Sequence, residues 1–344
     1  MIIDVSVKHR KTLALILSLS VSLAFTLAFA VACERATTDS LPDVTSEKTI
    51  KFGYITADQL HSPAVMVMKE KKLLEAAGFS VEWHEYIAGA HAIQDMASGK
   101  IDFANCGVAP IIINHSQGLN LAILSGSNQE GSSLVVTDSI KTIPDLDGKT
   151  IATPGIGSIQ DTIIIRLEMM NNITIKHTTM EVSDMPGFLR SGEIDGFIAW
   201  APHPANAVSQ NAGHELLTSR DVLLNHQCCV MVTEDDTLKN DQETVYKVLE
   251  IYLDAHKWFL ENQEEAVSLL VKTTGAKEDI IRQALTTVKY AYPPYCDADS
   301  IADIARGLIN AGRITTKEAE LDVFIKSLYQ PGLMETITGT KRPD

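Results

Sequence analysis

The phrase Ser98-Gly99-Lys100-Ile101-Asp102-Phe103, with Val108-Ala109-Pro110 after it, returns later in the chain. The second copy reads Ser191-Gly192-Glu193-Ile194-Asp195-Gly196-Phe197 and runs on to Trp200-Ala201-Pro202. Each copy closes a helix-then-strand pattern, so the repeat predicts two similar α/β lobes in one chain. Two lobes form a cleft, and clefts between domains are favoured places to bind small molecules.

Apolar periodicity around the first copy predicts a largely parallel sheet covered by helices, because strands and helices alternate with short connections. Strands are expected at 49–55, 81–86, 101–104 and 119–125, and helices at 64–77, 90–98 and 110–117. The alternation resumes around the second copy, with strands expected at 132–136, 150–153, 179–182, 194–199 and 227–232, and helices at 159–171, 185–191 and 204–210. Beyond residue 241 the pattern becomes helical, near 277–291, 301–311 and 317–329.

The predicted fold class is therefore α/β, with two lobes that are each a mostly parallel sheet flanked by helices. We expect the later helices to pack back on the first lobe, which makes the second lobe an insertion. Lobe 1 then comprises residues 48–137 and 234–330, lobe 2 comprises 138–233, and the chain crosses near Thr137 and Thr233. Residues 331–344 are expected to form a C-terminal tail.

The N-terminus has the composition of an export signal. Lys8, Arg10 and Lys11 precede an uncharged apolar stretch, and Ala30-Val31-Ala32-Cys33 follows it. The last four residues resemble a bacterial lipobox, which predicts a signal peptide at 1–32 and a lipid anchor on Cys33. Residues 33–47 are read as a flexible tether. The alternative is a retained transmembrane anchor; either way the rest of the chain is exported and lies in the periplasm or on the cell surface.

Charge and cysteine content exclude some partners. The 344 residues carry a net charge of −15, which argues against a nucleic-acid partner. Cys106, Cys228, Cys229 and Cys296 follow neither a disulfide nor a zinc spacing. On a strand, Cys228 and Cys229 would point to opposite faces, with Cys228 on the face of His226. A metal site there is the less favoured reading, and buried thiols that pack as small hydrophobes are favoured. No metal or cofactor is expected.

Four stretches in this order resemble the nitrate/sulfonate/taurine group of ABC-transporter solute-binding proteins, over roughly residues 48 to 330. They are Leu146–Ala152, Pro154–Ser158, Ser191–Asp195 and Trp200–Pro202. The resemblance implies the two-lobed type II periplasmic-binding-protein fold. It also implies a monomer that captures a small solute outside the cell and hands it to the permease and ATPase of an importer.

The predicted ligand-binding residues lie beyond the carboxyl ends of strands, where ligands sit in open α/β sheets. The loops expected to meet there are 58–62, 105–109, 127–132 and 155–160. The predicted residues are His61, Ser62, Asn105, Cys106, Gly107, Asn128, Glu130, Gly157, Ser158, Ile159, Trp200 and His226. Ser158 is a candidate N-cap whose helix N-terminus would favour an anion. The alternative is that the glycines before it only form the strand-to-helix turn.

Other residues in these loops also have two readings. Trp200 either stacks on a flat ligand or belongs to a lobe core. Glu130 would oppose a purely anionic ligand if it points inward. The loops hold no basic residue except His61, which weakens nitrate or sulfate as the solute. A sulfonate, a zwitterion such as taurine or a heteroaromatic such as a pyrimidine remain as candidate solutes.

Two other functions are weighed against solute binding. One is an enzyme on the same fold, similar to relatives in pyrimidine or menaquinone synthesis, and the other is a sensor module for a signalling partner. The chain shows no convincing catalytic constellation, and its export signal disagrees with the cytoplasmic location of those enzymes. A binding protein, and not an enzyme, is therefore expected.

Overall fold

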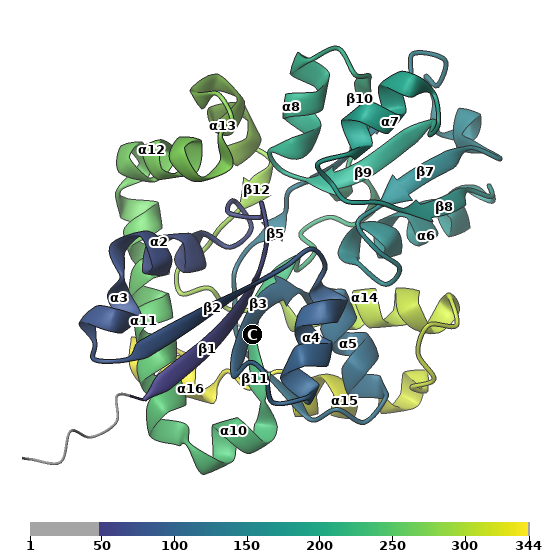
Figure 1. Ribbon diagram of the computed structural model, residues 1–344. Coiled ribbons are helices and arrows are strands. Elements are labelled where there is room, and N and C mark those ends of the chain that lie inside the picture. Colours follow the sequence, from purple (N-terminus) through teal and green to yellow (C-terminus); the bar gives the residue numbers. More distant parts are fainter. Residues whose placement is uncertain (1–47, 343–344) are drawn as a thin grey trace, which may run out of the picture. The chain divides into compact units, whose positions relative to one another are not determined.

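The computed structural model describes residues 48–342 of the chain (Figure 1). The predicted signal peptide, the tether and Cys33 lie outside these residues. No helix of the described part is both long and apolar enough to cross a membrane.

The first lobe is built on a five-stranded sheet in the order β2-β1-β3-β11-β4. Its strands are β1 (Thr49–Ile55), β2 (Ser80–Tyr86), β3 (Phe103–Gly107), β4 (Leu121–Gly126) and β11 (Cys229–Glu234). β1 pairs in parallel with β2 and β3, whereas β11 is antiparallel to both of its neighbours. The prediction of a mostly parallel sheet holds, with one antiparallel strand inserted.

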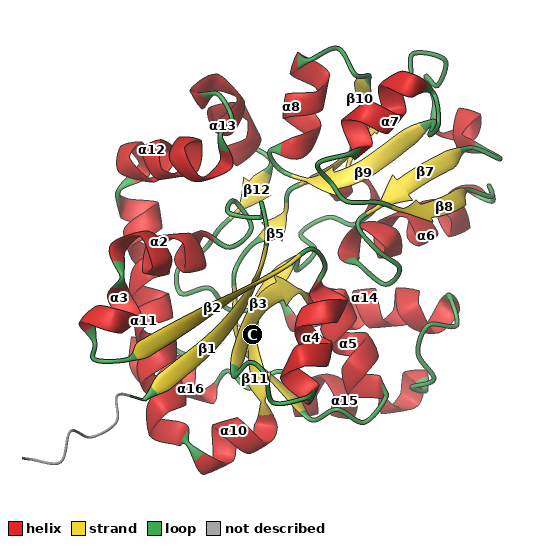
Figure 2. Ribbon diagram, viewed as in Figure 1, coloured by secondary structure: helices red, strands yellow, loops and turns green. Residues whose placement is uncertain are grey.

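The second lobe repeats this plan in the order β10-β6-β9-β7-β8. Its strands are β6 (Ser132–Val136), β7 (Thr150–Thr153), β8 (Lys176–Thr179), β9 (Gly196–Trp200) and β10 (His214–Thr218). Here β6 is the antiparallel strand beside β9, as β11 is beside β3. Figure 2 shows both sheets with helices packed around them.

The repeated phrase has the same structural role in both lobes. The Asp102 carboxylate accepts a hydrogen bond from the backbone N–H of Lys51 on β1, at 2.8 Å. The Asp195 carboxylate accepts one from the N–H of Thr150 on β7, also at 2.8 Å. In each case the aspartate binds the start of the neighbouring strand, so the two copies hold equivalent strands in register.

The lobe boundaries expected from the sequence are wrong. β6 was expected in lobe 1 but pairs with β9 and β10, and β11 was expected in lobe 2 but pairs with β3 and β4. The chain therefore crosses before each of these strands, not after it. Both strands are almost entirely buried apolar runs, and such a run does not reveal which sheet it joins.

The crossings form a small hinge ribbon. β5 (Gln129–Glu130) pairs antiparallel with β12 (Val288–Lys289), and Gln129 also forms a bridge with Gln227. The two crossing segments therefore lie side by side, and β12 pairs beside them.

Two helical layers cover the first sheet. The long helix α11 packs on α2, and the buried Tyr252 lies in the core between α11 and the sheet. The helices of this lobe are α2 (Pro63–Lys71), α3 (Leu73–Ala76), α4 (Gly89–Ala97), α5 (Val108–Ser116), α10 (Asp235–Asn240) and α11 (Gln242–Glu261). The single helix expected at 64–77 is divided, because Lys72 adopts the left-handed conformation with φ of 52°.

The second lobe has shorter helices. They are the 3₁₀ turn η1 (Ile143–Leu146), α6 (Ile159–Asn171), α7 (Met185–Ser191), α8 (His203–Ser209) and α9 (Ser219–Val222). The edge strand β10 and helix α9 were not predicted. β10 is only partly buried, so it lacks the apolar run that marks the other strands.

The C-terminal helices do not pack on lobe 1 alone. α13 contacts α8 of the second lobe, and α14 contacts both α5 and α6 (Figure 1). These helices are α12 (Gln263–Thr274), α13 (Glu278–Leu285), α14 (Ala298–Asn310), the 3₁₀ turn η2 (Glu318–Glu320), α15 (Leu321–Leu328) and α16 (Gly332–Thr338). The expected tail at 331–344 is also corrected, because α16 packs on α11 and buries Met334 in the core of lobe 1.

Candidate functional site

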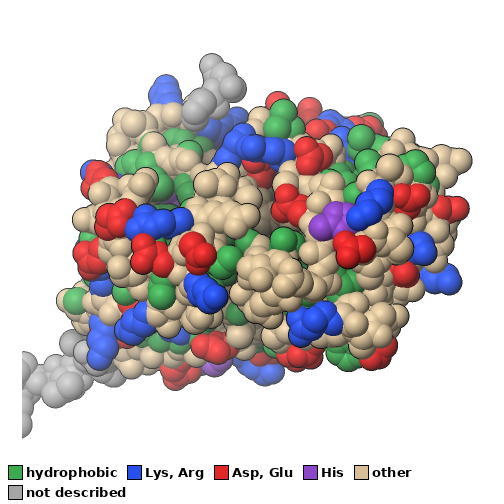
Figure 3. Space-filling view, turned by 90° about the horizontal axis from the view of Figure 1, so that it is seen from above, with side chains coloured by type: hydrophobic (Ala, Val, Ile, Leu, Met, Phe, Trp, Pro, Cys, Tyr) green, Lys and Arg blue, Asp and Glu red, His purple; other side chains and the backbone are tan. Residues whose placement is uncertain are grey.

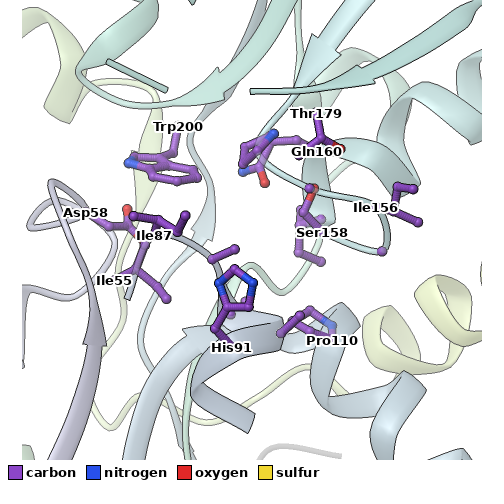
Figure 4. A pocket seen from close by; sticks show the side chains of 18 of the residues that line it. Ile55, Asp58, Ile87, His91, Pro110, Ile156, Ser158, Gln160, Thr179 and Trp200 are labelled. Atoms are coloured by element: carbon purple, nitrogen blue, oxygen red, sulfur yellow. The ribbon is translucent and has the colours of Figure 1, made fainter. Parts of the chain in front are cut away.

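A cavity of about 480 Å³ lies between the lobes. It is lined by residues just beyond the carboxyl ends of β1, β3, β7 and β9, and by the start of β11. The size is in the range of small-molecule pockets, and the position is the one that open α/β sheets use for ligands. In Figure 4, Trp200, Gln160 and Ser158 face Ile55, Asp58 and His91 across it.

The lobe 2 wall is formed by the turn between β7 and α6. Ser158 is the N-cap of α6 and accepts a hydrogen bond from the N–H of Asp161, as its sequence position predicted. The Asp161 carboxylate accepts a second bond, from the N–H of Gly157 at 2.8 Å. Within the described residues, the N–H groups of Ile159 and Gln160 have no protein acceptor. They remain available to a polar group in the cavity.

Trp200 connects the two walls. Its indole N–H donates to the carbonyl of Ala57 in lobe 1 at 3.1 Å, and His203 Nε2 lies 3.1 Å from the same oxygen. The indole ring also lines the cavity. Trp200 therefore combines both readings of the sequence, since it is 6% exposed yet forms part of the cavity wall.

The lobe 1 wall contains four buried polar side chains. Asp58 and His61 come from the loop after β1, and Cys228 and Cys229 from the start of β11. His61 Nδ1 lies 3.4 Å from the Cys228 sulfur and 3.6 Å from Asp58 Oδ1. The two sulfurs are 4.0 Å apart, and the Cys229 sulfur is 3.7 Å from Asp58 Oδ2. We call this group the thiol–imidazole cluster.

Burial and mutual contact shift the titration of the cluster. Burial raises the pKa of Asp58 to about 7, against the attraction of His61. Burial lowers the pKa of His61, but the attraction of Cys228 and Asp58 and two hydrogen bonds outweigh it and raise the value to about 9. The hydrogen bond from Cys229 is the largest cause that holds the pKa of Cys228 well below its usual value. These shifts favour ionisation of Cys228 ahead of Cys229.

The rest of the cavity wall is mainly apolar. Ile55, Ile87, Pro110, Ile156 and Ile159 contribute aliphatic surface from both lobes. No lysine or arginine of residues 48–342 lines the cavity, in agreement with the sparse basic residues of the loops. A fully inorganic oxyanion would find no guanidinium or ammonium partner on this wall.

The structure brings half of the predicted ligand-binding residues to the cavity. His61, Gly107, Gly157, Ser158, Ile159 and Trp200 line it. Their contact with a ligand stays a prediction. The other six lie elsewhere, for reasons that follow from their own hydrogen bonds.

Ser62, Asn105 and Cys106 belong to the core of lobe 1. Asn105 Nδ2 donates to Ser62 Oγ at 2.8 Å, and its Oδ1 accepts from the Tyr252 hydroxyl at 2.8 Å. Cys106 is fully buried in the apolar core, where burial raises its pKa to about 12. A polar residue at a strand end was read as a ligand, but its partners are side chains of the same lobe.

Asn128 and Glu130 belong to the hinge ribbon. Arg220 donates two hydrogen bonds to Glu130 Oε2, and the N–H of Asn225 donates one to Oε1. Asn128 Oδ1 accepts from the N–H of Cys229 at 3.1 Å. Glu130 therefore does not point into the cavity, and it places no restriction on an anionic solute.

His226 is buried away from the cavity and its Nδ1 bonds to the carbonyl of Leu223 at 2.8 Å. His61, not His226, accompanies the cysteine pair. The expectation that Cys228 and Cys229 point to opposite faces is wrong, because β11 begins only at Cys229 and the strand alternation does not include Cys228. The sequence did indicate the loop 58–62 as part of the site. Only the folded chain shows that this loop meets residue 228.

Comparison with known proteins agrees with this architecture. The model of the NMT1-like family matches residues 44–272. The taurine-binding periplasmic protein of Escherichia coli (strain K12) is 24% identical over 278 residues, which cover 75% of this chain and 84% of that protein.

Two solved structures share the fold. The ligand-binding component of an ABC-type import system from Staphylococcus aureus, with zinc bound, has a TM-score of 0.71 at 17% identity and covers 86% of this chain and 100% of that one. The periplasmic aliphatic sulphonate binding protein SsuA from Escherichia coli has a TM-score of 0.63 at 21% identity. The match covers 79% of this chain and 95% of that one. The predicted two-lobed fold is confirmed.

Proposed function

Because this chain belongs to the NMT1-like family, we propose that it is an exported solute-binding protein that delivers a small organic solute to an ABC permease and its ATPase. The observation that carries the proposal is the cavity of about 480 Å³ between two lobes, at the carboxyl ends of strands from both. The expectation of a binding protein and not an enzyme agrees with the relatives, whose names are those of binding proteins.

The cavity wall favours a solute with an apolar or aromatic body and one compact polar group. The aliphatic side chains and the Trp200 indole would cover the body. The N–H groups of Ile159 and Gln160 at the start of α6 would serve the polar group. Organic sulfonates fit this description, and a relative is named for taurine. The flat face of Trp200 also suits a pyrimidine-like ring.

Closure of the lobes about the hinge ribbon would enclose the solute. The bonds from Trp200 and His203 to the Ala57 carbonyl join the lobes beside the cavity, and β5 and β12 form the pivot. A solute that contacts both walls binds the closed arrangement better and shifts the population toward it.

The lipid anchor at Cys33 and the monomeric state complete the proposal. The lipobox-like Ala30-Val31-Ala32-Cys33 supports the anchor. Mass spectrometry of the protein from a bacterial host would show a diacylated N-terminal cysteine. A chain that still carries residues 1–32 would contradict the anchor, and light scattering would report the oligomeric state.

The test of solute binding is native mass spectrometry of the purified protein, followed by calorimetry with alkanesulfonates, taurine, nitrate and pyrimidines. We expect one organic compound to bind and nitrate not to bind. The variant Trp200→Ala should weaken binding by about 10- to 100-fold, since ring contacts contribute about 1–3 kcal/mol. Trp258→Phe, outside the cavity, is the matched control. A folded protein that binds none of these compounds would contradict the proposal.

A further inference from the structure

The thiol–imidazole cluster is not needed to form a solute cavity, yet it gathers four side chains of three ligand types in a small buried volume. His61 Nδ1 and the sulfurs of Cys228 and Cys229 all lie within 4.8 Å of one another. His61 is separated from Cys228 by 167 residues. Two separate segments of lobe 1 have therefore been folded to bring donor atoms together.

The separations match the edges of a metal tetrahedron. With Zn–S bonds of about 2.3 Å and Zn–N or Zn–O bonds of about 2.0 Å, tetrahedral geometry sets two sulfurs about 3.8 Å apart and sulfur about 3.5 Å from nitrogen or oxygen. The observed values are 4.0 Å for sulfur to sulfur and 3.4 Å for sulfur to His61 Nδ1. Asp58 lies 3.7 Å from the Cys229 sulfur and 3.6 Å from His61 Nδ1. The two Asp58 distances involve different oxygens, Oδ1 toward His61 and Oδ2 toward Cys229, so Asp58 lies beside the group formed by His61 and the two sulfurs.

Asp58 provides an independent sign of a missing partner. Asp58 is 3% exposed, and its Oδ1 is buried without a hydrogen-bond partner among the described residues. A buried carboxylate oxygen without a partner is costly, and a cation at the centre of the cluster would remove that cost.

The surroundings orient the donor atoms as metal sites require. His61 Nε2 lies 3.1 Å from the carbonyl of Gly131, which can only accept, so Nε2 carries a proton and Nδ1 is the nitrogen that faces the cluster and ligates once it is deprotonated. The backbone N–H of Cys229 is held by Asn128 Oδ1 at 3.1 Å. The His61 ring cannot turn away without breaking its buried hydrogen bond to Gly131, and the Asn128 bond fixes the Cys229 backbone.

From this geometry we propose that His61 Nδ1, Cys228 Sγ and Cys229 Sγ form a site for a borderline-soft divalent cation, with Zn²⁺ as its type and the Asp58 carboxylate beside it. Two thiolates and an imidazole select Zn²⁺ over Mg²⁺ or Ca²⁺, which prefer oxygen ligands. Each thiol gives up its proton to solvent when it ligates the ion. All four residues line the cavity, so the ion enters from the cleft.

The test uses the purified, reduced protein, stripped with a chelator and titrated with Co²⁺. We expect one Co²⁺ per chain, with a thiolate-to-cobalt charge-transfer band and the visible bands of a tetrahedral complex, and we expect Zn²⁺ to displace it. A folded, reduced wild-type protein that shows no thiolate-to-cobalt band overturns the proposal, and this result needs no variant.

Variants then assign the ligands. Cys229→Ser and His61→Gln should each weaken Co²⁺ binding by more than the roughly 10- to 100-fold typical of outer partners, and Asp58→Asn by less than Cys229→Ser. Cys296→Ser replaces another buried free cysteine outside the cluster and should bind as wild type. Unchanged binding in folded Cys229→Ser overturns the assignment. Solute binding, measured separately on the metal-free protein, reports on the proposed function alone.

Discussion

The two lobes place very different chemistry at equivalent positions. In lobe 1 the loop after the first strand, β1, buries Asp58 and His61 against a pair of cysteines. In lobe 2 the loop after the equivalent strand, β7, presents a glycine turn and the start of α6. Lobe 1 thus offers buried titratable side chains to the cavity and lobe 2 offers backbone N–H groups and an indole. A duplicated scaffold therefore supports two unlike walls, because the shared residues hold strands and the loops are free to differ.

The contrast between a common scaffold and a distinctive site also holds for the charges on the surface. Figure 3 shows acidic and basic side chains interspersed over one face of the molecule. The net charge of −15 is therefore not expressed there as a single acidic field. The distinguishing chemistry lies within the cleft, and the following predictions test how the two walls differ.

The largest effect is expected at Gly131, between β5 and β6, which packs tightly behind His61 of the lobe 1 wall. Gly131 has φ of +91°, and a Cβ there would lie 2.5 Å from His61 Nε2 and 2.8 Å from a Val288 methyl. Gly131→Ala should lower the free energy of unfolding by about 2–4 kcal/mol, from backbone strain and overpacking. Urea denaturation measures it.

Gly155→Ala on the lobe 2 wall is the matched control. Its Cβ would meet only Ala88, at 3.9 Å, so we expect between no change and about 1 kcal/mol of stabilisation. Equal losses for both variants would contradict the contrast between a packed wall and an open one.

A second difference concerns pH. Burial lowers the pKa of His256 in lobe 1 from 6.5 to about 4, while its Nε2 bonds to the Ala291 carbonyl. A lowered histidine pKa contributes stability that is present above about pH 6.5 and is lost as the pH falls toward about 4, by at most about 3 kcal/mol. His256→Gln should therefore flatten the acid limb of a plot of unfolding free energy against pH.

His177 of lobe 2 should act with the opposite sign. Its hydrogen bonds to Asp161 and Glu168 raise its pKa, against desolvation. That stability is complete below the ordinary pKa and is lost as the pH rises through the raised value. His177→Gln should change the unfolding free energy where the pH rises through the raised pKa, and it should leave the acid limb of the plot unchanged. An acid limb that changes in His177→Gln but not in His256→Gln would refute both assignments.

The third prediction tests what the lobes share. Asp102→Ala and Asp195→Ala each remove the carboxylate that accepts a backbone N–H at 2.8 Å. Both should lower the free energy of unfolding by about 1–2 kcal/mol, since both carboxylates are half-buried. Asp138→Ala, at an exposed side chain, should change little. If the losses of unfolding free energy for Asp102→Ala and Asp195→Ala differ by more than about 1 kcal/mol, the two copies of the repeat are not energetically equivalent.

The smallest effect is expected at the contact between the walls. Trp200→Phe keeps an aromatic ring but loses the indole bond to the Ala57 carbonyl, a cost of about 0.5–1.5 kcal/mol. We expect the solute-free protein to open more, and small-angle scattering would show a larger radius of gyration than for wild type. Trp83→Phe, which packs on Phe52 away from the cavity, is the control. Identical scattering for wild type and Trp200→Phe would show that this bond does not hold the lobes together.

Much of the scaffold could be predicted from local sequence. The strand at 49–55, the helix at 159–171 and the Ser158 cap were predicted at the positions where they occur. These features depend on periodicity and on capping residues that act within a few positions. Local patterns did not place β6 and β11, because a buried apolar strand fits either sheet equally well.

The residues of the candidate site show the same difference between local and long-range information. Ser158 and Trp200 lie at the cavity as expected, because Ser158 follows the turn after one predicted strand and Trp200 directly follows another. Glu130 and Asn105 lie outside the cavity because their partners, Arg220 and Tyr252, which are distant in sequence, hold them elsewhere. Polar residues at strand ends satisfy the same local criteria whether they face a ligand or another side chain.

By itself the sequence determined the repeated α/β plan, because the spacing of apolar residues and the paired aspartates act over short distances. Only the tertiary structure decided that His61 and Asp58 meet Cys228 and Cys229. That meeting depends on the return of β11 between β3 and β4, and the pairing of strands from opposite ends of the chain is set by the packing of the whole lobe. No local pattern carries that information, since sequence neighbours constrain a side chain's direction but not its distant partner.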